Sequence, residues 1–332
     1  MWFGALPPAQ ALGAILAHSM QVAGKPWRKG LVLDAQAVAA LQQAGIREVT
    51  VAQLGTGDIE ENTAARRLAA ALVPDPVAAC LTRGTAFTGR VNINAVGPGI
   101  VEVDARAVRA LNRVDPSVTL ATLAPHTRVG TRTLVGTVKI ISYGVTEASL
   151  QQACAVAHAA LRVRPVERRS AGLVLTEVPG QKKSLTVKGQ AAIAQRLAAL
   201  GMALAEVRVV AHETTALAQG LCGLTGEITL ILTGSATSDL HDVGPQGVRV
   251  AGGQVARFGM PVDPGNLLFI GDLEGKPVIG LPGCARSPAL NGADWVLERL
   301  ACGLEVTDDD IAAMGVGGLL KEIPMRPQPR EP

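Results

Sequence analysis

The 332-residue sequence predicts an α/β protein with a three-layer α/β/α second half, built on a mainly parallel sheet, after a mixed α+β first half. Between about 170 and 300, nearly continuous apolar runs of strand length alternate with helical patterns, which is typical of strands covered on both faces. Shorter β-like runs, punctuated by Gly, Pro and Asn, occupy about 87–145. At roughly 150 residues per domain, the length favours about two domains.

The first half begins with apolar residues at helical spacing around 12–16, which predict a helix. Asp34 is typical of an N-cap that begins a second helix, and Gly45 of the left-handed residue that ends it. A strand over 48–54 and a helix over 61–72 follow.

The texture then changes to short strands, for which we expect 90–94, 118–123 and 135–142. A helical stripe of apolar residues from Leu150 to Leu161 closes this half. The basic, proline-containing stretch 162–169 is the expected domain boundary.

The second half repeats strand and helix regularly enough to predict a parallel β-α-β-α-β layout. The expected elements are strand 171–176, a helix containing Ile193, Leu197 and Leu200, strand 207–211, helix 213–222, strand 228–233 and a hairpin over 267–281. Ser287 then indicates the N-cap of a last helix, with Pro288 at its first position. The expected divisions are residues 1–163, 164–310 and a C-terminal tail or linker over 311–332.

Composition excludes several classes of protein. With 48% hydrophobic and 18% charged residues the chain is not disordered, and its apolar runs are too short to span a membrane. The 31 basic and 28 acidic residues nearly balance, and aromatic residues make up 2%, so nucleic acid is not an expected partner. Five scattered cysteines without a CxxC pair, and no visible secretory signal, favour reduced thiols and a cytoplasmic location.

Ligands of parallel sheets bind outside the carboxyl ends of the strands, so the loops after the strands are the candidate sites. These loops are 176–180, 233–242 and 281–284. The second is rich in hydroxyls and ends in Asp239 and Asp242, so its N–H groups and hydroxyls suit a phosphate, with Mg²⁺ shared between phosphate and carboxylates. The alternative is a capped helix start with acids in its first turn.

Four motifs carry a resemblance to a known family. They are Thr-Gly-Ser-Ala-Thr-Ser-Asp-Leu-His-Asp from 233, Ala-Gly-Gly-Gln-Val from 251, Asp-Pro-Gly-Asn-Leu from 263 and Val-Ile-Gly-Leu-Pro-Gly-Cys from 278. Residues 165–305 thereby resemble the molybdopterin-binding domain of molybdopterin molybdotransferases and adenylyltransferases. The first half is similar to a companion region of bacterial molybdopterin-binding proteins.

The resemblance implies a role in molybdenum cofactor biosynthesis. It implies binding of molybdopterin or its nucleotide form, transferase activity that inserts molybdate, Mg²⁺ (magnesium) as a cofactor, and a homo-oligomer. A nucleotidyltransferase is an implied partner. A non-catalytic carrier or scaffold for that partner or for a target enzyme is the alternative, and a pyridine-nucleotide hydrolase of the same fold is a third possibility.

The resemblance also implies site residues. The family's Gly-Gly-x-Ser-x-Gly-x-x-Asp loop falls on 234–242, where Asp242 keeps the acid as the implied catalytic and metal residue and Asp239, in place of glycine, assists it. The implied cofactor-binding residues are Thr176, Glu177, Thr233, Gly234, Ser235, Ala236, Thr237, Ser238, Gly265, Asn266, Pro282, Gly283, Cys284, Arg286 and Ser287. Asn266 stands where the family has an anion-neutralising lysine, which favours the carrier, and Arg286 is able to restore one positive charge.

Some candidates lie outside these motifs. His212 follows the second strand of the parallel layout, and His241 lies within the hydroxyl-rich loop, so both are placed where ligands gather. In the first half, the run 87–93 combines Arg90 and Asn92 in a way that suits a phosphate, with a plain β-turn as the alternative.

Overall fold

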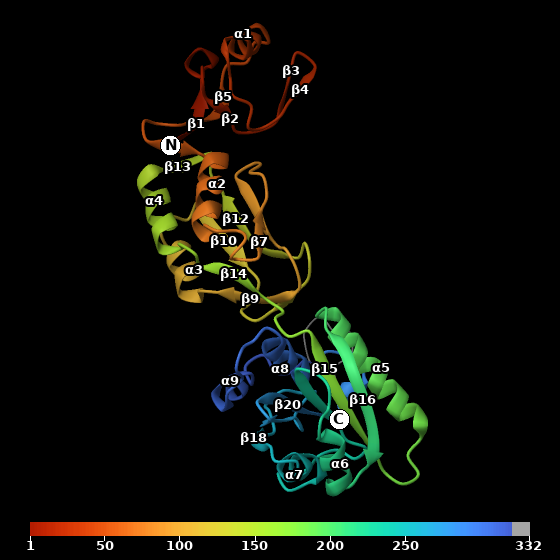
Figure 1. Cartoon of the computed structure of the whole chain (residues 1–332). Helices are drawn as coiled ribbons and strands as arrows, with labels where there is room; N and C mark the ends of the chain where they lie inside the picture. Colours follow the sequence, from red (N-terminus) through yellow and green to blue (C-terminus); the bar gives the residue numbers. More distant parts are fainter. Residues whose placement is uncertain (321–332) are drawn as a thin grey trace. The chain divides into compact units, whose positions relative to one another are not determined.

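The structure, a computed structural model, describes residues 1–320. The chain divides into two compact units, one of residues 1–97 and 101–164 and the other of 98–100 and the residues from 165 onward (Figure 1). The fold is mixed α/β with a mostly parallel six-stranded sheet in the second unit. No helix within the described residues is long and apolar enough to cross a membrane.

The first unit begins with a small antiparallel sheet in the order β1-β5-β2. Its elements are β1 (Trp2–Leu6), η1 (Pro8–Gln10), β2 (Ile15–Leu16), β3 (Met20–Val22), β4 (Lys25–Trp27), α1 (Ala35–Gln43) and β5 (Val49–Gln53). The helix expected around 12–16 is wrong, because Gly13 adopts a left-handed φ of 77° and the next apolar pair forms β2. Asp34 is confirmed as an N-cap, accepting from the Ala37 amide at 2.8 Å.

The rest of the first unit packs helices on one face of an antiparallel sheet in the order β10-β12-β8-β7. Its elements are β6 (Asp58–Glu60), α2 (Glu61–Leu72), β7 (Leu81–Arg83), β8 (Arg90–Ala95), β9 (Gly99–Val103), α3 (Ala105–Leu111), β10 (Val118–Thr122), β11 (Arg128–Val129), β12 (Leu134–Ile140), β13 (Gly144–Thr146), α4 (Glu147–Val156) and β14 (Leu161–Pro165). Apolar side chains of α2, α3 and α4 form one buried cluster with those of the strands. The predicted helical stripe ends early, because Leu161 begins β14.

The second unit is built on a sheet in the order β16-β15-β17-β20-β19-β18. Strands β15 (Ser170–Glu177), β16 (Ala203–Ala211), β17 (Ile228–Leu232) and β20 (Lys276–Leu281) are parallel, while β19 (Phe269–Leu273) is antiparallel to β20 and β18 (Gln254–Phe258) to β19. The helices are α5 (Lys183–Ala199), α6 (Thr214–Leu221), α7 (Val243–Val250), α8 (Gly292–Ala301) and α9 (Asp308–Ala313), with a 3₁₀ helix η2 (Gly283–Arg286).

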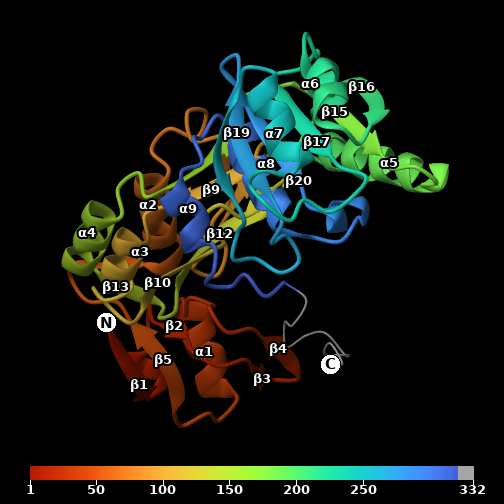
Figure 2. The same ribbon diagram turned by 90° about the horizontal axis from the view of Figure 1, so that it is seen from below.

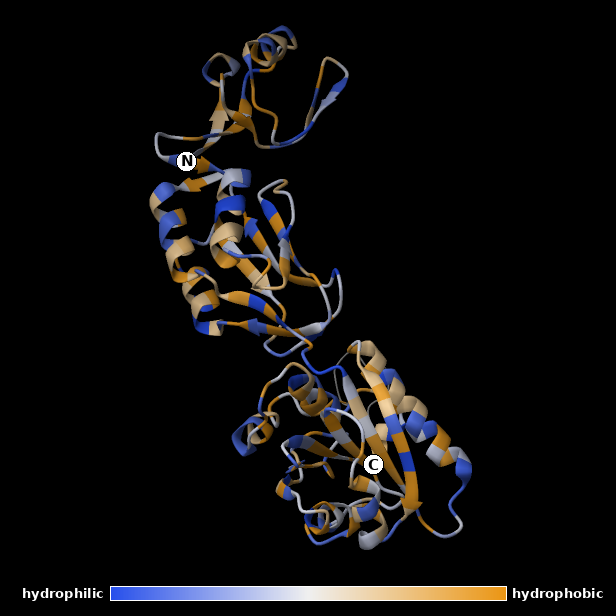
Figure 3. Cartoon of the chain, in the orientation of Figure 1, coloured by the Kyte–Doolittle hydropathy of each residue, from blue (hydrophilic) through white to orange (hydrophobic). Residues whose placement is uncertain are grey.

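Alternate residues of the central strands contribute to two separate buried clusters. Leu173 and Leu175 of β15 pack with α5 and α8, whereas Val174 between them packs with α6 and α7. The two helix groups therefore contact opposite faces of the sheet, as the period-2 alternation of a strand requires. The helices and strands can be followed in Figures 1 and 2, and Figure 3 shows apolar and polar residues alternating along α5.

The last described segment differs from expectation in two places. The N-cap of α8 is Asn291, which forms a capping box with Asp294, and Ser287 instead follows η2 in extended backbone. Ile311 and Met314, which fall within the expected tail 311–332, are buried in the core of the second unit. The remainder of that tail, 321–332, lies outside the described residues.

Candidate functional site

The carboxyl ends of three parallel strands are joined by one buried hydroxyl. Thr176, at the end of β15, is 1% exposed, and its Oγ1 lies 2.8 Å from His212 Nδ1, just beyond β16. The same oxygen accepts a hydrogen bond from the Gly234 amide, after β17, at 2.8 Å. Since Thr176 accepts from Gly234, its proton is available to His212 Nδ1 when that nitrogen is an acceptor, which leaves the other ring nitrogen as a donor. These two contacts hold the carboxyl ends of β15, β16 and β17 together.

A second polar group supports the end of β15 from helix α5. Thr186 donates to Glu177 Oε1, and Gln181 lies within 3.4 Å of the Thr186 hydroxyl. Gly234 approaches this segment so closely that an added Cβ would lie 2.7 Å from the Thr176 carbonyl oxygen and 2.8 Å from Gln181 Oε1. Only glycine fits there without displacing the backbone.

Arg286, at the end of η2, places a cation beside the end of β17. Its Nη2 donates to the Thr233 carbonyl oxygen at 2.7 Å, and its stem packs near Gly189 of α5. Its Nε is buried without a hydrogen-bond partner, and within residues 1–320 no carboxylate pairs with the guanidinium. Burial lowers the pKa of Arg286, because desolvation disfavours its charged form.

The loop 233–242 uses its two carboxylates to hold its own backbone. Asp242 accepts from the Ser238 amide at 2.9 Å and, as N-cap of α7, from the Val243 amide at 2.7 Å. Asp239 accepts from the His241 amide at 2.8 Å. Partial burial by itself raises the pKa of Asp242, but the hydrogen bonds from Ser238 and Val243, with the nearby His212, leave it below its ordinary value.

These contacts decide how well the acids suit a metal. Both oxygens of Asp242 and one of Asp239 already accept backbone N–H groups. Within residues 1–320, no group of three or more His, Cys, Asp or Glu side chains is placed to hold a metal ion. The donor set does not fit a Mg²⁺ held by the protein, so we derive no step through one.

The hydroxyls of the loop divide into buried and exposed groups. Thr233 and Thr237 are 4% exposed, and Thr237 Oγ1 lies close to Gly244, at the start of α7. Ser235, Ala236 and Ser238 are exposed. The loop therefore presents Ser235 and Ser238, and not its threonines, to solvent.

The remaining predicted residues lie on the same edge of the sheet. Pro282, Gly283 and Cys284 follow β20 directly, in the path that leads to Arg286, and Ser287 is exposed beyond it. Gly265 and Asn266 lie between β18 and β19, at the end where β20 finishes, because Phe269 pairs with Gly280. Gly265 packs against Gly292 at the start of α8. No hydrogen bond within the described residues joins this segment to the loop 233–242.

The positioning of the segment after β20 depends on Arg196, which sequence reasoning missed. Arg196 is 7% exposed, pairs with Asp294 at 2.7 Å, and donates to the carbonyl oxygens of Ala285, Ser287 and Ala289. A charged residue on the apolar face of α5, one turn from Ile193 and beside Leu197, was the available signal. Gln181 and Thr186 gave no such signal.

Helix α7 is seated on the aromatic ring of Phe269. An added Cβ at Gly244 would lie 2.9 Å from that ring, and one at Gly280 of β20 would overlap it at 1.9 Å. The ring therefore fills the space that both glycines leave open, and it positions the helix that Asp242 caps.

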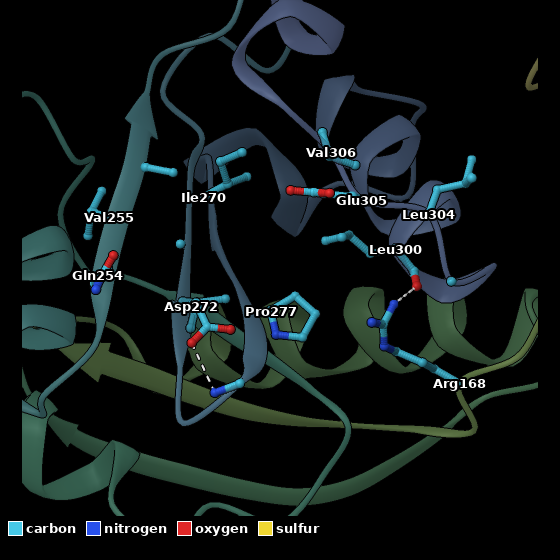
Figure 4. Close-up of a pocket in the computed structure, with 15 residues that line it drawn as sticks. Arg168, Gln254, Val255, Ile270, Asp272, Pro277, Leu300, Leu304, Glu305 and Val306 are labelled. Atoms are coloured by element: carbon cyan, nitrogen blue, oxygen red, sulfur yellow. Dashed lines mark hydrogen bonds between the residues drawn. The ribbon is translucent and has the colours of Figure 1, made fainter.

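A cavity of about 430 Å³ lies at the opposite edge of the sheet (Figure 4). Its wall includes Asp272 and Pro277, at the turn between β19 and β20, and Arg168. Asp272 accepts from the Gly275 amide and Arg168 donates to the Leu300 carbonyl oxygen, so these charged groups are engaged locally. None of the predicted site residues lines this cavity.

Comparisons with known proteins give a limited match. Residues 5–53 match a domain of unknown function, DUF8806. No curated protein matches the chain.

Several solved structures are similar to the chain at low identity. A molybdopterin biosynthesis MoeA protein from Pyrococcus horikosii is 15% identical, with 92% of this chain and 76% of that one covered and a TM-score of 0.32. A molybdenum cofactor biosynthesis protein B is 13% identical over 42% of this chain and 96% of that one, with a TM-score of 0.31. A molybdenum cofactor biosynthesis protein from Pyrococcus furiosus is 12% identical over 94% and 65%, with a TM-score of 0.22. TM-scores of this size establish no shared function.

Proposed function

We propose that the second unit binds a phosphorylated pterin of the molybdopterin type at the carboxyl edge of its sheet, as part of molybdenum cofactor biosynthesis. The observation that carries the proposal is Arg286 beside the end of β17, a half-buried guanidinium whose Nε has no hydrogen-bond partner among residues 1–320. A buried cation without a counter-charge destabilises the unliganded protein, and an anionic ligand removes that cost. That the ligand is a pterin is inferred from the motif resemblance over residues 165–305.

The surrounding groups support an anion of phosphate size. Arg286 presents planar donors that suit phosphate oxygens, and the exposed Ser235 hydroxyl adds a donor from the 233–242 loop. His212, oriented by Thr176, contributes a ring nitrogen at the same edge. Catalysis at such a site consists of positioning and electrostatic stabilisation.

Of the two molybdopterin-binding roles that the sequence leaves open, we favour the carrier. Asp239 and Asp242 already cap their own loop, and Asn266 and Cys284 add no charge where the resembled family has polar or cationic groups. A carrier hands its pterin to a second protein, for which a nucleotidyltransferase is the proposed partner. Insertion of molybdate is the second candidate function, and self-association stays a prediction.

Titration of the full chain with molybdopterin tests the proposal. We expect Arg286→Met to weaken binding by about 10- to 100-fold, because charge-assisted hydrogen bonds contribute about 1.5–3 kcal/mol. Arg257→Met, which removes an arginine paired with Asp308 elsewhere in the unit, is the matched control and should bind as the wild type does. Equal affinity of Arg286→Met and wild type for molybdopterin would contradict the proposal.

A molybdate-insertion assay separates the two roles. A carrier shows no insertion with the wild type. If the wild type inserts molybdate and Asp242→Asn loses insertion while it still binds the pterin, the enzyme role is correct and the carrier is wrong.

A further inference from the structure

The first unit carries a row of side chains that the proposed function does not use. Arg90 of β8 pairs in register with Lys139 of β12, and Lys139 pairs with Thr119 of β10. On the other side, Phe87 forms a β-bridge with Arg90. Because residues directly opposite each other in an antiparallel sheet point to the same face, these four side chains share one face. The apolar cluster with α2, α3 and α4 occupies the opposite face.

Two cations in this row stand directly opposite each other. Like charges at such positions destabilise a sheet. Lys139 donates to the Thr88 carbonyl oxygen, and the Glu61 carboxylate acts on it electrostatically. Arg90 is exposed and makes no side-chain hydrogen bond or ion pair within residues 1–320. The row thus keeps one uncompensated positive charge beside a second cation.

The turn that joins Phe87 to Arg90 is strained. Thr88 has a left-handed φ of 46°, which a β-branched residue rarely adopts, and Gly89 follows with 68°. The turn is held by the Asn62 side chain, which accepts from the Gly89 amide at 2.9 Å. Strain of this kind persists where the surrounding structure enforces it, often at ligand sites.

The row also offers space and a flat apolar surface. A hollow of about 530 Å³ is lined by Arg90, Asn112, Thr119, Thr137 and Lys139 among others. Phe87 is 76% exposed at the end of the row, next to Arg90. An exposed aromatic ring beside a cation suits a ligand with both a ring and a negative charge.

We propose that this face of the first unit binds a small phosphorylated compound with an aromatic ring system, such as a nucleotide. The phosphate lies against Arg90 and Lys139, and the ring stacks on Phe87. This site lies within the first unit and does not depend on the proposed pterin site in the second.

Calorimetric titration of the full chain with ADP, pyrophosphate and adenosine tests the proposal. We expect ADP to bind more tightly than pyrophosphate, and pyrophosphate more tightly than adenosine. Arg90→Gln should weaken ADP about tenfold, the loss of one charge-assisted hydrogen bond. Phe87→Ala should weaken ADP about tenfold because base stacking is lost, but it should leave pyrophosphate unchanged because pyrophosphate has no ring to stack.

The matched control is Arg83→Gln. Arg83 of β7 pairs in register with the buried Ile93, so it lies on the other face of the same sheet, and its variant should bind ADP as the wild type does. The same titrations in Arg286→Met separate this site from the second unit, since ADP binding should persist there.

Stability distinguishes a ligand site from a structural role. Relief of the like-charge pair should leave the Tm of Arg90→Gln unchanged or raise it by about 1–3 °C. A lower Tm in that variant, unchanged ADP affinity, loss of ADP binding in Arg286→Met, or tighter binding of single-stranded oligonucleotide than of ADP would each overturn the proposal.

Discussion

Two arginines of the second unit occupy neighbouring places and show opposite electrostatics. Arg196 is buried, pairs with Asp294, and donates to the carbonyl oxygens of Ala285 and Ser287, which flank the last residue of η2. Arg286 lies at that end, and within residues 1–320 it has one carbonyl partner, a buried Nε without a hydrogen bond and no acidic partner. The first arginine has its acid and carbonyl partners in place, whereas the second keeps a buried Nε that has no hydrogen-bond partner among the described residues. The contrast separates a structural cation from a candidate binding cation without reference to any relative.

The largest expected effect concerns the satisfied arginine. Arg196→Met removes the partner of buried Asp294 and the donors to four carbonyl oxygens, so it should destabilise the second unit by about 3–5 kcal/mol. Thermal unfolding should show a Tm lower by roughly 10 °C. Arg196→Met combined with Asp294→Asn should recover part of the loss. A Tm within 2 °C of wild type would break the comparison, since Arg196 would then not hold this segment.

A smaller and opposite effect is expected at the orphan arginine. Arg286→Met replaces an uncompensated cation by an apolar side chain of similar length, so the free energy of unfolding of the unliganded protein should stay within about 1 kcal/mol of wild type or rise. Chemical denaturation in the absence of pterin measures it. A loss of 3 kcal/mol or more would make Arg286 structural, like Arg196.

The smallest expected effect is a pH dependence at the hydroxyl-rich loop. The folded pKa of Asp242 lies below its ordinary value of 3.8, so its contribution to stability is present above that value and is lost as the pH falls through the folded pKa. Asp242→Asn should therefore flatten the loss of stability below about pH 4. Denaturation midpoints from pH 2 to 6 check this, with Asp239→Asn as the neighbouring control. If the denaturation midpoints of wild type and Asp242→Asn fell equally between pH 4 and pH 2, the prediction would be contradicted.

The sequence predicted the second unit better than the first, for a physical reason. Strands such as β15 and β17 are buried on both faces, so their apolar runs are unmistakable, whereas the pair Ile15 and Leu16 is too short to separate strand from helix. The start of α8 was misplaced because Asn291 and Asp294 form a better cap than Ser287 and Pro288. Both pairs are ordinary N-cap signals in the sequence. The contacts of Arg196 with Asp294 and with the Ser287 carbonyl favour a helix that begins after Asn291.

At the candidate site, sequence placed the strand-end loops on one edge but not their contacts. The meeting of Thr176, His212 and Gly234 depends on strand order, which no local pattern contains. That Asp239 and Asp242 turn inward to their own backbone likewise follows from the path of the loop. Residue types predicted the chemistry available, and geometry decided which groups remain free for it.

The ring of Phe269 links two positions that are distant in the chain, Gly244 and Gly280. A methyl group introduced at 280 has no room beside that ring, so the ring or the strand must shift, and the same ring contacts the start of α7 at Gly244. A shift of α7 would also move the 233–242 loop, which ends at the cap residue Asp242, although the residues of that loop are unaltered. Position 280 is therefore coupled through one ring to a loop that lies far from it in the sequence.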